Sequence, residues 1–117
     1  MARSRLWWVL AAMIAGCGSP GEVRPDEVAL EFVRSTDPSK CRLLTLELLE
    51  RQTGRRGDDA LRFCERNVAG ASAPQDVELI EAEVLGGKAL VEIRADDREE
   101  SLELVRREDG WRIYATR

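Results

Sequence analysis

Residues 89–116 read ALVEIRADDREESLELVRREDGWRIYAT, and along most of this stretch apolar side chains alternate with polar ones. Alternation with a period of two is typical of β-strands that bury one face. Asp96-Asp97 and Asp109-Gly110 interrupt the alternation, and Asp-Gly is a frequent hairpin turn. The stretch therefore predicts three antiparallel strands, the last of which holds Trp111, Ile113 and Ala115 in one phase.

A further strand is predicted over residues 76–85, and Gly86-Gly87 supplies the turn that follows it. Its alternation changes phase, because Val77 and Leu79 share one phase and Ile80, Ala82 and Val84 share the other. An extra residue near Leu79-Ile80 would restore a single apolar face. We therefore expect a β-bulge there, which would curve the sheet.

Glu81 and Glu83 lie in the same predicted strand, and their role depends on where the bulge falls. If the bulge follows them, both carboxylates share the phase of Val77 and Leu79 and form a pair inside the fold. A buried carboxylate pair would be suited to acid–base chemistry. The alternative hypothesis is that both belong to a solvated face.

The first half of the chain has helical spacing in place of alternation. The predicted helices are one from near Pro25 to the Asp37-Pro38 break, one from about Pro38 to Gln52 with Gly54 as its C-terminal cap, and one from an Asp58 N-cap to about Val68. Helices followed by an antiparallel meander predict an α+β domain over residues 25–117. In it, N-terminal helices pack on one face of a curved four-stranded sheet.

The N-terminus has the pattern of an export signal. Arg3 and Arg5 are followed by ten uncharged, largely apolar residues, which are too few to span a bilayer as a helix. The tetrapeptide Ile14-Ala15-Gly16-Cys17 then resembles the lipobox of bacterial lipoproteins. The alternatives are a signal peptide that is cut elsewhere and a segment that is not cut.

The lipobox resemblance implies a signal peptide over residues 1–16, a lipid on Cys17 and a linker over residues 17–24. The protein would then be anchored to the outer face of the bacterial cell membrane. Since Gly18 and not Asp follows the cysteine, the resemblance favours the outer membrane in an organism with two membranes.

Charge and composition exclude several classes of function. The chain carries 18 Lys and Arg against 22 Asp and Glu, and removal of residues 1–16 with their two Arg moves its formal charge from −4 to −6. Binding to nucleic acid needs a clustered basic surface, so we expect no nucleic-acid partner. The chain has no His, which is the commonest general base and metal ligand. We therefore expect no metal, no cofactor and no catalytic residue.

Cys41 and Cys64 remain as a pair once Cys17 is assigned to the lipobox. Each shares helical spacing with apolar residues, which places both sulfurs on stripes that face the core. In an exported domain a disulfide is expected, and it would contribute about 3 kcal/mol by closing a loop of this length. The alternative is a pair of buried, reduced thiols.

Three features together resemble the small exported members of the nuclear-transport-factor-2-like superfamily. They are the opening helix Val28-Ala29-Leu30-Glu31-Phe32-Val33, the cysteine pair in the helical half, and the final hairpin Val105-Arg106-Arg107-Glu108-Asp109-Gly110-Trp111-Arg112-Ile113. The resemblance implies a cone in which the curved sheet wraps around the helices. Many relatives use the interior of that cone as a ligand or active-site pocket.

The resemblance defines the candidate binding residues. A pocket in the cone would be lined by Phe32, Phe63, Val91, Ile93 and Trp111, although a Trp at this position more often closes the open end of the core. We expect a non-catalytic domain that binds a small apolar ligand or an envelope protein, with a homodimer through the sheet as a further option. The alternatives are an isomerase- or hydratase-type enzyme and a structural interaction module.

One basic loop, Arg55-Arg56, offers a second hypothesis. It could hold an anionic headgroup or an acidic side chain of a partner. The alternative is an ordinary solvated loop.

Overall fold

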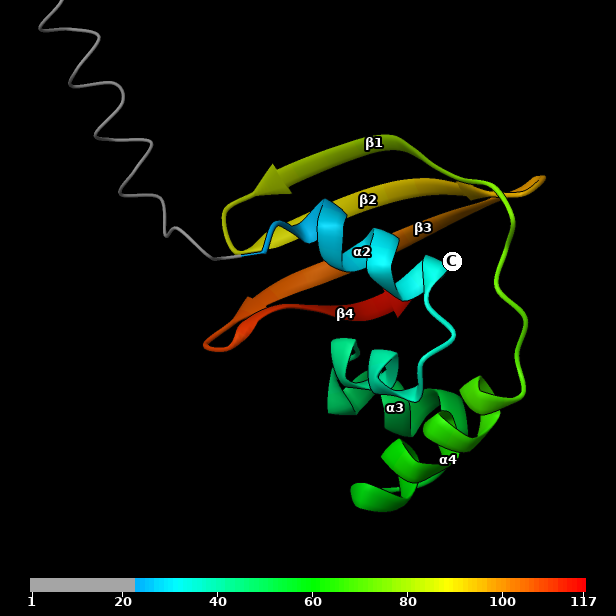
Figure 1. The fold of residues 1–117 in the computed structure, drawn as a ribbon. Helices are drawn as coiled ribbons and strands as arrows, with labels where there is room; N and C mark the ends of the chain where they lie inside the picture. The colour runs from blue at the N-terminus through cyan, green and yellow to red at the C-terminus, as the bar shows by residue number, and fades with distance from the viewer. Residues whose placement is uncertain (1–22) are drawn as a thin grey trace, which may run out of the picture.

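A computed structural model describes residues 23–117, and Figure 1 shows how their helices and strands are arranged. The elements are, in order, α2 (Pro25–Arg34), the 3-10 helix η1 (Pro38–Leu43), α3 (Leu46–Thr53), α4 (Asp58–Ala69), β1 (Val77–Leu85), β2 (Lys88–Ala95), β3 (Arg98–Arg107) and β4 (Gly110–Thr116). The lipobox and Cys17 lie outside the described residues.

The four strands form one antiparallel sheet in the order β1-β2-β3-β4, so the predicted meander is confirmed. The predicted bulge is confirmed too, because the β1–β2 register shifts between Leu79 and Glu81 and leaves Ile80 as the extra residue. Leu79 is opposite Ile93, and Ala82 is opposite Val91, so both β1 residues keep the phase of the core. The bulge thus keeps these residues in one phase, while all of β1 after the partly buried Val77 is exposed.

A second bulge was not predicted. The β3–β4 register shifts between Glu103 and Leu104, because Leu104 is opposite Ile113 whereas Glu103 is opposite Ala115. Tyr114 is therefore the extra residue of β4. The prediction that Ala115 shares the phase of Trp111 and Ile113 is wrong, since the bulge turns Ala115 to the face that carries Glu103.

The helical half differs from the prediction at Leu44 and Thr45. In place of one helix from Pro38 to Gln52, η1 ends at Leu43, and α3 begins at Leu46. Thr45 has extended backbone angles, and its hydroxyl accepts a hydrogen bond of 3.2 Å from the Leu48 N–H, as an N-cap does. Leu44 forms a parallel bridge with Ile113 of β4, and this pairing replaces a continuous helix.

Two glycines delimit the loop between α3 and α4. Gly54 has φ 72° at the end of α3, which confirms it as the predicted C-cap. The N-cap of α4 is Gly57, with φ 56°, and not Asp58, which is already the first helical residue. Asp58 still lies in the first turn, where its carboxylate stabilises the positive end of the helix.

The core lies between α2 and the sheet. α2 packs on β1, β2 and β4, and it buries Val28, Ala29 and Val33 there. The largest fully buried side chains are Ile93, Leu102, Leu104, Ile113, Val91 and Cys41. In Figure 1, α3 and α4 lie beyond β4, on the side of the sheet away from β1.

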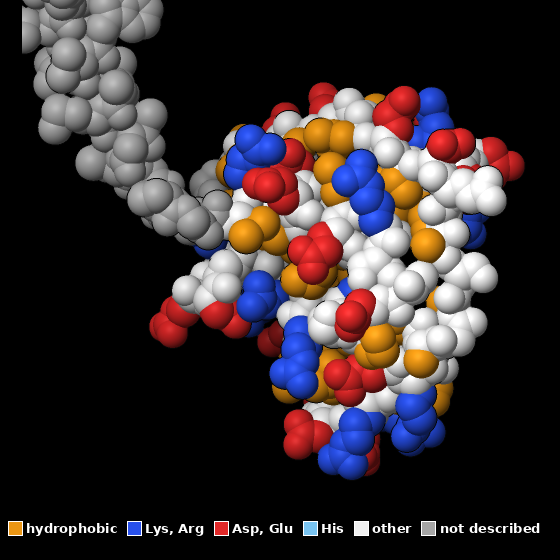
Figure 2. All heavy atoms as spheres, in the orientation of Figure 1, with side chains coloured by type: hydrophobic (Ala, Val, Ile, Leu, Met, Phe, Trp, Pro, Cys, Tyr) orange, Lys and Arg blue, Asp and Glu red, His pale blue; other side chains and the backbone are white. Residues whose placement is uncertain are grey.

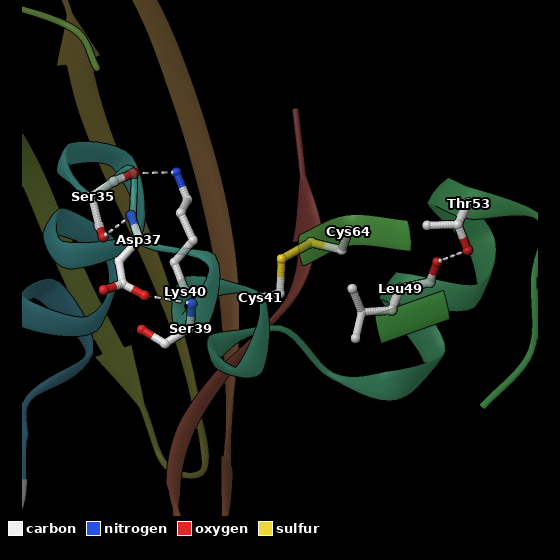
Figure 3. Close-up of a disulfide and its surroundings, with 8 residues drawn as sticks. All are labelled: Ser35, Asp37, Ser39, Lys40, Cys41, Leu49, Thr53 and Cys64. Carbon is white, nitrogen blue, oxygen red and sulfur yellow. Dashed lines mark hydrogen bonds between the residues drawn. A yellow bond between two sulfur atoms is a disulfide. The ribbon is translucent and has the colours of Figure 1, made fainter. Parts of the chain in front are cut away.

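Cys41 and Cys64 form a disulfide, so the prediction of a bridge is confirmed (Figure 3). It joins η1 to α4, with a distance of 6.1 Å between the two Cα atoms. Cys41 is fully buried, and Cys64 is partly buried against the core. The disulfide thus fixes α4 to η1, and Leu44, which directly follows η1, pairs with β4 of the sheet.

Candidate functional site

The structure places the five predicted pocket residues apart. Val91 and Ile93 are fully buried, and Trp111 is only 4% exposed, so these three are part of the packed core. Phe32 is partly buried against that core, with the Lys40 ammonium 4.6 Å from its ring centre. Phe63 lies on α4 and contacts Arg55 instead. The concave side of the sheet is therefore filled where the predicted pocket would lie.

Glu81 and Glu83 do not form an internal pair. The bulge precedes both residues, which puts them opposite Glu92 and Leu90, on the face of the sheet away from the core. Both are exposed. The hypothesis of a paired carboxylate inside the fold is wrong, and the alternative of a solvated face is correct.

The largest hollow described is a groove between α3 and the outer face of the sheet. Its volume is about 760 Å³, which falls within the usual range of ligand pockets. Its lining residues are Thr45, Glu47, Glu50, Arg51, Gly54, Arg55, Arg56, Lys88, Val105, Arg107 and Tyr114. Lys88, Val105 and Arg107 belong to the strand phase opposite to the buried residues, so the groove and α2 lie on opposite faces. We call this hollow the basic groove.

Positive charge dominates the basic groove, since five Lys and Arg line it against two Glu. Both carboxylates already have partners. Glu47 forms an ion pair of 3.7 Å with Arg107, and the Glu50 carboxylate accepts a hydrogen bond of 2.9 Å from the Gly57 N–H. The groove thus has a formal excess of three positive charges in a chain whose net charge is −4.

Tyr114 forms part of the floor of the groove. Its hydroxyl donates a hydrogen bond of 3.1 Å to the Glu103 carboxylate, and the Lys88 ammonium lies 5.9 Å from the centre of its ring. Burial raises the pKa of Tyr114, and the hydrogen bond to Glu103 raises it further. The second bulge produces this position, because it makes Tyr114 the unpaired residue of β4.

Three arginines come from α3 and the loop after it. Arg51 donates a hydrogen bond of 2.6 Å to the Tyr114 carbonyl, which ties α3 to the edge of β4. The Arg55 guanidinium lies 4.5 Å from the centre of the Phe63 ring and is held there by a cation–π contact. Arg56 is exposed and lines the same groove.

Of the cations in this groove, only Arg55 and Arg56 could be predicted from the sequence as a binding loop. The structure adds Arg51, Lys88 and Arg107 to it, from α3, β2 and β3. No sequence signal joins these residues, because each has an ordinary surface position within its own element. Only the packing of α3 beside the outer face of the sheet brings them together.

The other groups whose pKa values are shifted lie outside the groove. Hydrogen bonds from Ser39 lower the pKa of Asp37, burial lowers the pKa of Lys40, and the hydrogen bond to Glu99 raises the pKa of Arg94. Within residues 23–117 there is no group of three or more His, Cys, Asp or Glu side chains placed to hold a metal ion. No helix in that part of the chain is long and apolar enough to cross a membrane.

No protein-family model matches the chain, and no curated protein sequence does. A search of solved structures found similarity to the crystal structure of an NTF-2 like protein of unknown function from Silicibacter pomeroyi DSS-3. The two chains are 15% identical, with a TM-score of 0.47, over 99% of this chain and 96% of the other. The similarity concerns the arrangement of helices and strands and says nothing about what either protein binds.

The class of protein follows from the structure itself. It is an α+β domain in which N-terminal helices cover one face of a curved, four-stranded antiparallel meander. Its interior is packed, and its main hollow is the basic groove on the outer face.

Proposed function

We propose that this protein is a lipoprotein, anchored by a lipid on Cys17 to the outer face of the bacterial cell membrane, and that its domain binds other molecules without catalysis. The support for the anchor is the order of basic start, apolar run and small residues before Cys17. Several acyl chains on one residue would hold the domain at the membrane for long times.

We propose that binding takes place in the basic groove and not inside the fold. The observation that carries this proposal is that the interior is packed, whereas the outer face has a cationic hollow of about 760 Å³. The charge excess and the Tyr114 and Val105 surfaces suit an organic anion that also has an apolar part. A small, wholly apolar ligand is less well supported, because the residues predicted to line its pocket are core residues.

The polar groups of the interior support a non-catalytic role. Thr45 is the one buried polar side chain among the described residues, and its hydroxyl is occupied in capping α3. A general acid or base needs a titratable group held near a reacting atom. In the basic groove, the two carboxylates are already bonded to Arg107 and to the Gly57 N–H, and the Tyr114 hydroxyl donates to Glu103, which leaves the Lys and Arg cations.

The homodimer through the sheet is less well supported than a monomer. The outer face of the sheet carries Arg94, which forms ion pairs with Glu78 and Glu99. It also carries Glu103, which forms an ion pair with Arg117. These charges are already neutralised within one chain, so a second sheet would gain little from them. We expect a monomer at micromolar concentration in sedimentation velocity, and a concentration-dependent dimer would contradict this.

Two experiments test the proposal. Metabolic labelling with radioactive palmitate should label the full chain in a bacterial host, and Cys17→Ser should abolish the label and release the protein from membranes. A chain that is membrane-bound but unlabelled would refute the anchor.

The groove is tested with anilinonaphthalene sulfonate, an anion with apolar rings, by fluorescence titration of the oxidised protein. We expect Arg56→Gln/Lys88→Gln to weaken binding roughly tenfold, which corresponds to about 1.4 kcal/mol. Arg62→Gln removes the same kind of charge from α4, outside the groove, and should leave binding unchanged. Equal affinities for all three proteins would refute the groove as the site.

A further inference from the structure

The most exposed large apolar side chains of the described residues belong to one end of the domain. They are Leu85 at 70%, Val84 at 53%, and Val23 and Leu46 at 49% each. Leu85 and Val84 precede the turn between β1 and β2, Leu46 begins α3, and Val23 precedes α2. Exposed apolar groups that gather in one region mark contact surfaces more often than isolated ones do.

The strand order places these residues together. In a meander the β1–β2 turn and the β3–β4 turn lie at the same end of the sheet, and here the Arg106 N–H donates a hydrogen bond of 2.8 Å to the Gly87 carbonyl. Val23 lines a hollow with Glu108, Asp109 and Gly110 of the β3–β4 turn. Leu46 lines another with Arg107 and Asp109. We call this end of the domain the tether end.

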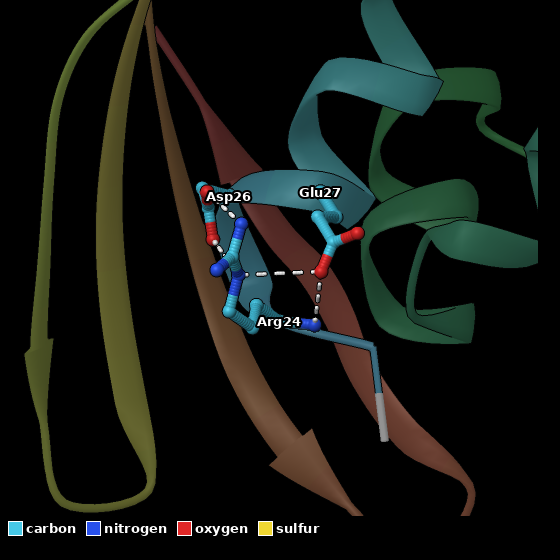
Figure 4. Close-up of polar contacts among 3 residues, drawn as sticks. All are labelled: Arg24, Asp26 and Glu27. Carbon is cyan, nitrogen blue, oxygen red and sulfur yellow. Dashed lines mark hydrogen bonds and ion pairs between the residues drawn. The ribbon is translucent and has the colours of Figure 1, made fainter. Parts of the chain in front are cut away.

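Arg24, which directly follows Val23, is held in place beside the first turn of α2. The Arg24 side chain forms ion pairs with Asp26 at 3.4 Å and Glu27 at 3.2 Å, and its N–H donates to the Glu27 carboxylate (Figure 4). These contacts fix the point from which the N-terminal segment leaves the domain. Five residues lie between Val23 and Cys17, and the six Cα–Cα steps that join these two residues can span at most about 20 Å. A lipid on Cys17 would therefore keep the tether end close to the bilayer.

The opposite end of the sheet is acidic. The turn between β2 and β3 carries Asp96 and Asp97, and Glu99 and Glu100 follow within β3. β3 is ten residues long, which puts this acidic end about 30 Å away along the strand. The tether end carries charges of both signs, since Lys88 and Arg107 flank its turns and Glu108 and Asp109 lie in one of them, and its exposed apolar side chains set it apart. Figure 2 shows that charges of both signs are mixed over the face that it displays, so the contrast concerns the two ends and not that face.

We infer that the tether end is a membrane-contact surface, and that its partner is the phospholipid bilayer to which the protein is anchored. This inference rests on the proposed lipid anchor. Val84 and Leu85 enter the interfacial region beside the β1–β2 turn, while Lys88 and Arg107 lie level with the headgroup phosphates. The strands then stand away from the membrane, and the acidic end points outward from an anionic surface.

The cysteines of the proposed mature protein make a direct test possible. Cys17 carries lipid and the other two form the disulfide, so an introduced cysteine is the one free thiol available for a fluorescent label. Two labelled full-length proteins, Glu108→Cys at the tether end and Asp97→Cys at the acidic end, are placed in vesicles of phosphatidylethanolamine and phosphatidylglycerol with spin-labelled lipids. We expect quenching at least threefold stronger at position 108 than at position 97.

A second pair of variants separates apolar contact from simple tethering. Val84→Ser/Leu85→Ser should reduce the quenching at position 108 by half or more. Ile80→Ser, which removes an exposed apolar residue elsewhere on β1, should not reduce it. An acylated protein with equal quenching at both positions, or with no effect of the double variant, would overturn the membrane-contact surface and leave the anchor intact. A chain without acylation would overturn both.

Discussion

Loss of the Cys41–Cys64 disulfide should destabilise the domain by a large part of its total stability. The two cysteines are 23 residues apart in sequence, and the chain-entropy treatment of a loop of this length gives about 3 kcal/mol. Small domains have total stabilities of about 5–15 kcal/mol. For a domain of this size the same loss corresponds to a fall in Tm of roughly 12–24 °C.

The effect should be strongest in α4. That helix packs on η1 and α3, and Ala60 is its one fully buried residue. Without the cross-link, α4 depends on this limited packing, so its amide hydrogens should become the least protected among the helices. The core strands β2 and β3 should keep the highest protection, because they hold the largest buried side chains.

The assay is urea unfolding of the oxidised protein with and without reductant, followed by amide hydrogen exchange under native conditions. The Cys41→Ala/Cys64→Ala variant is the control, since reductant should leave its unfolding free energy unchanged. A loss of less than about 1 kcal/mol on reduction would refute the entropic argument. If reduction lowered the amide protection of the strands and left that of α4 unchanged, the result would refute the dependence of α4 on the disulfide.

Three further predictions concern single side chains. Ile93→Ala should lower the unfolding free energy in urea by about 2–5 kcal/mol because Ile93 is fully buried, whereas Leu85→Ala should change it by less than about 0.5 kcal/mol. Thr45→Ala should cost about 1 kcal/mol by removing the cap of α3, and Thr45→Ser should recover most of that loss. The raised pKa of Tyr114 means that the folded chain keeps the phenol protonated to higher pH than the unfolded chain does. Stability should therefore fall as pH rises through the alkaline range, and thermal unfolding of Tyr114→Phe should lack that contribution; an identical pH dependence in both proteins would contradict it.

The strands and one bulge could be predicted because each has a visible pattern in the sequence. The phase change between Leu79 and Ile80 requires an extra residue if one face is to stay buried. The bulge at Tyr114 leaves no such trace, since Ala115 and Thr116 near the strand end tolerate either face. For a short side chain of moderate polarity, the sequence does not indicate which face of the sheet it occupies.

The helical half shows where local spacing misleads. Leu44 and Leu48 are four residues apart and fit a single helix, yet Leu44 pairs with Ile113 and Thr45 caps a new helix. That choice depends on a strand more than sixty residues away, which local sequence does not contain. The basic groove was missed for the same reason, because its cations come from α3, the loop after it, β2 and β3.

The pairing of Leu44 with Ile113 also affects how the protein can associate with other copies of itself. At the β4 edge, the Thr45 N–H donates to the Ile113 carbonyl at 2.8 Å, and Arg51 donates to the Tyr114 carbonyl. Of the two edges of the described sheet, β1 is thus the one left open to another chain, and it carries Glu81 and Glu83. Two copies that met edge to edge along β1 would bring these carboxylates together and repel each other. The acidic edge therefore protects this protein against edge-to-edge aggregation with other copies of itself.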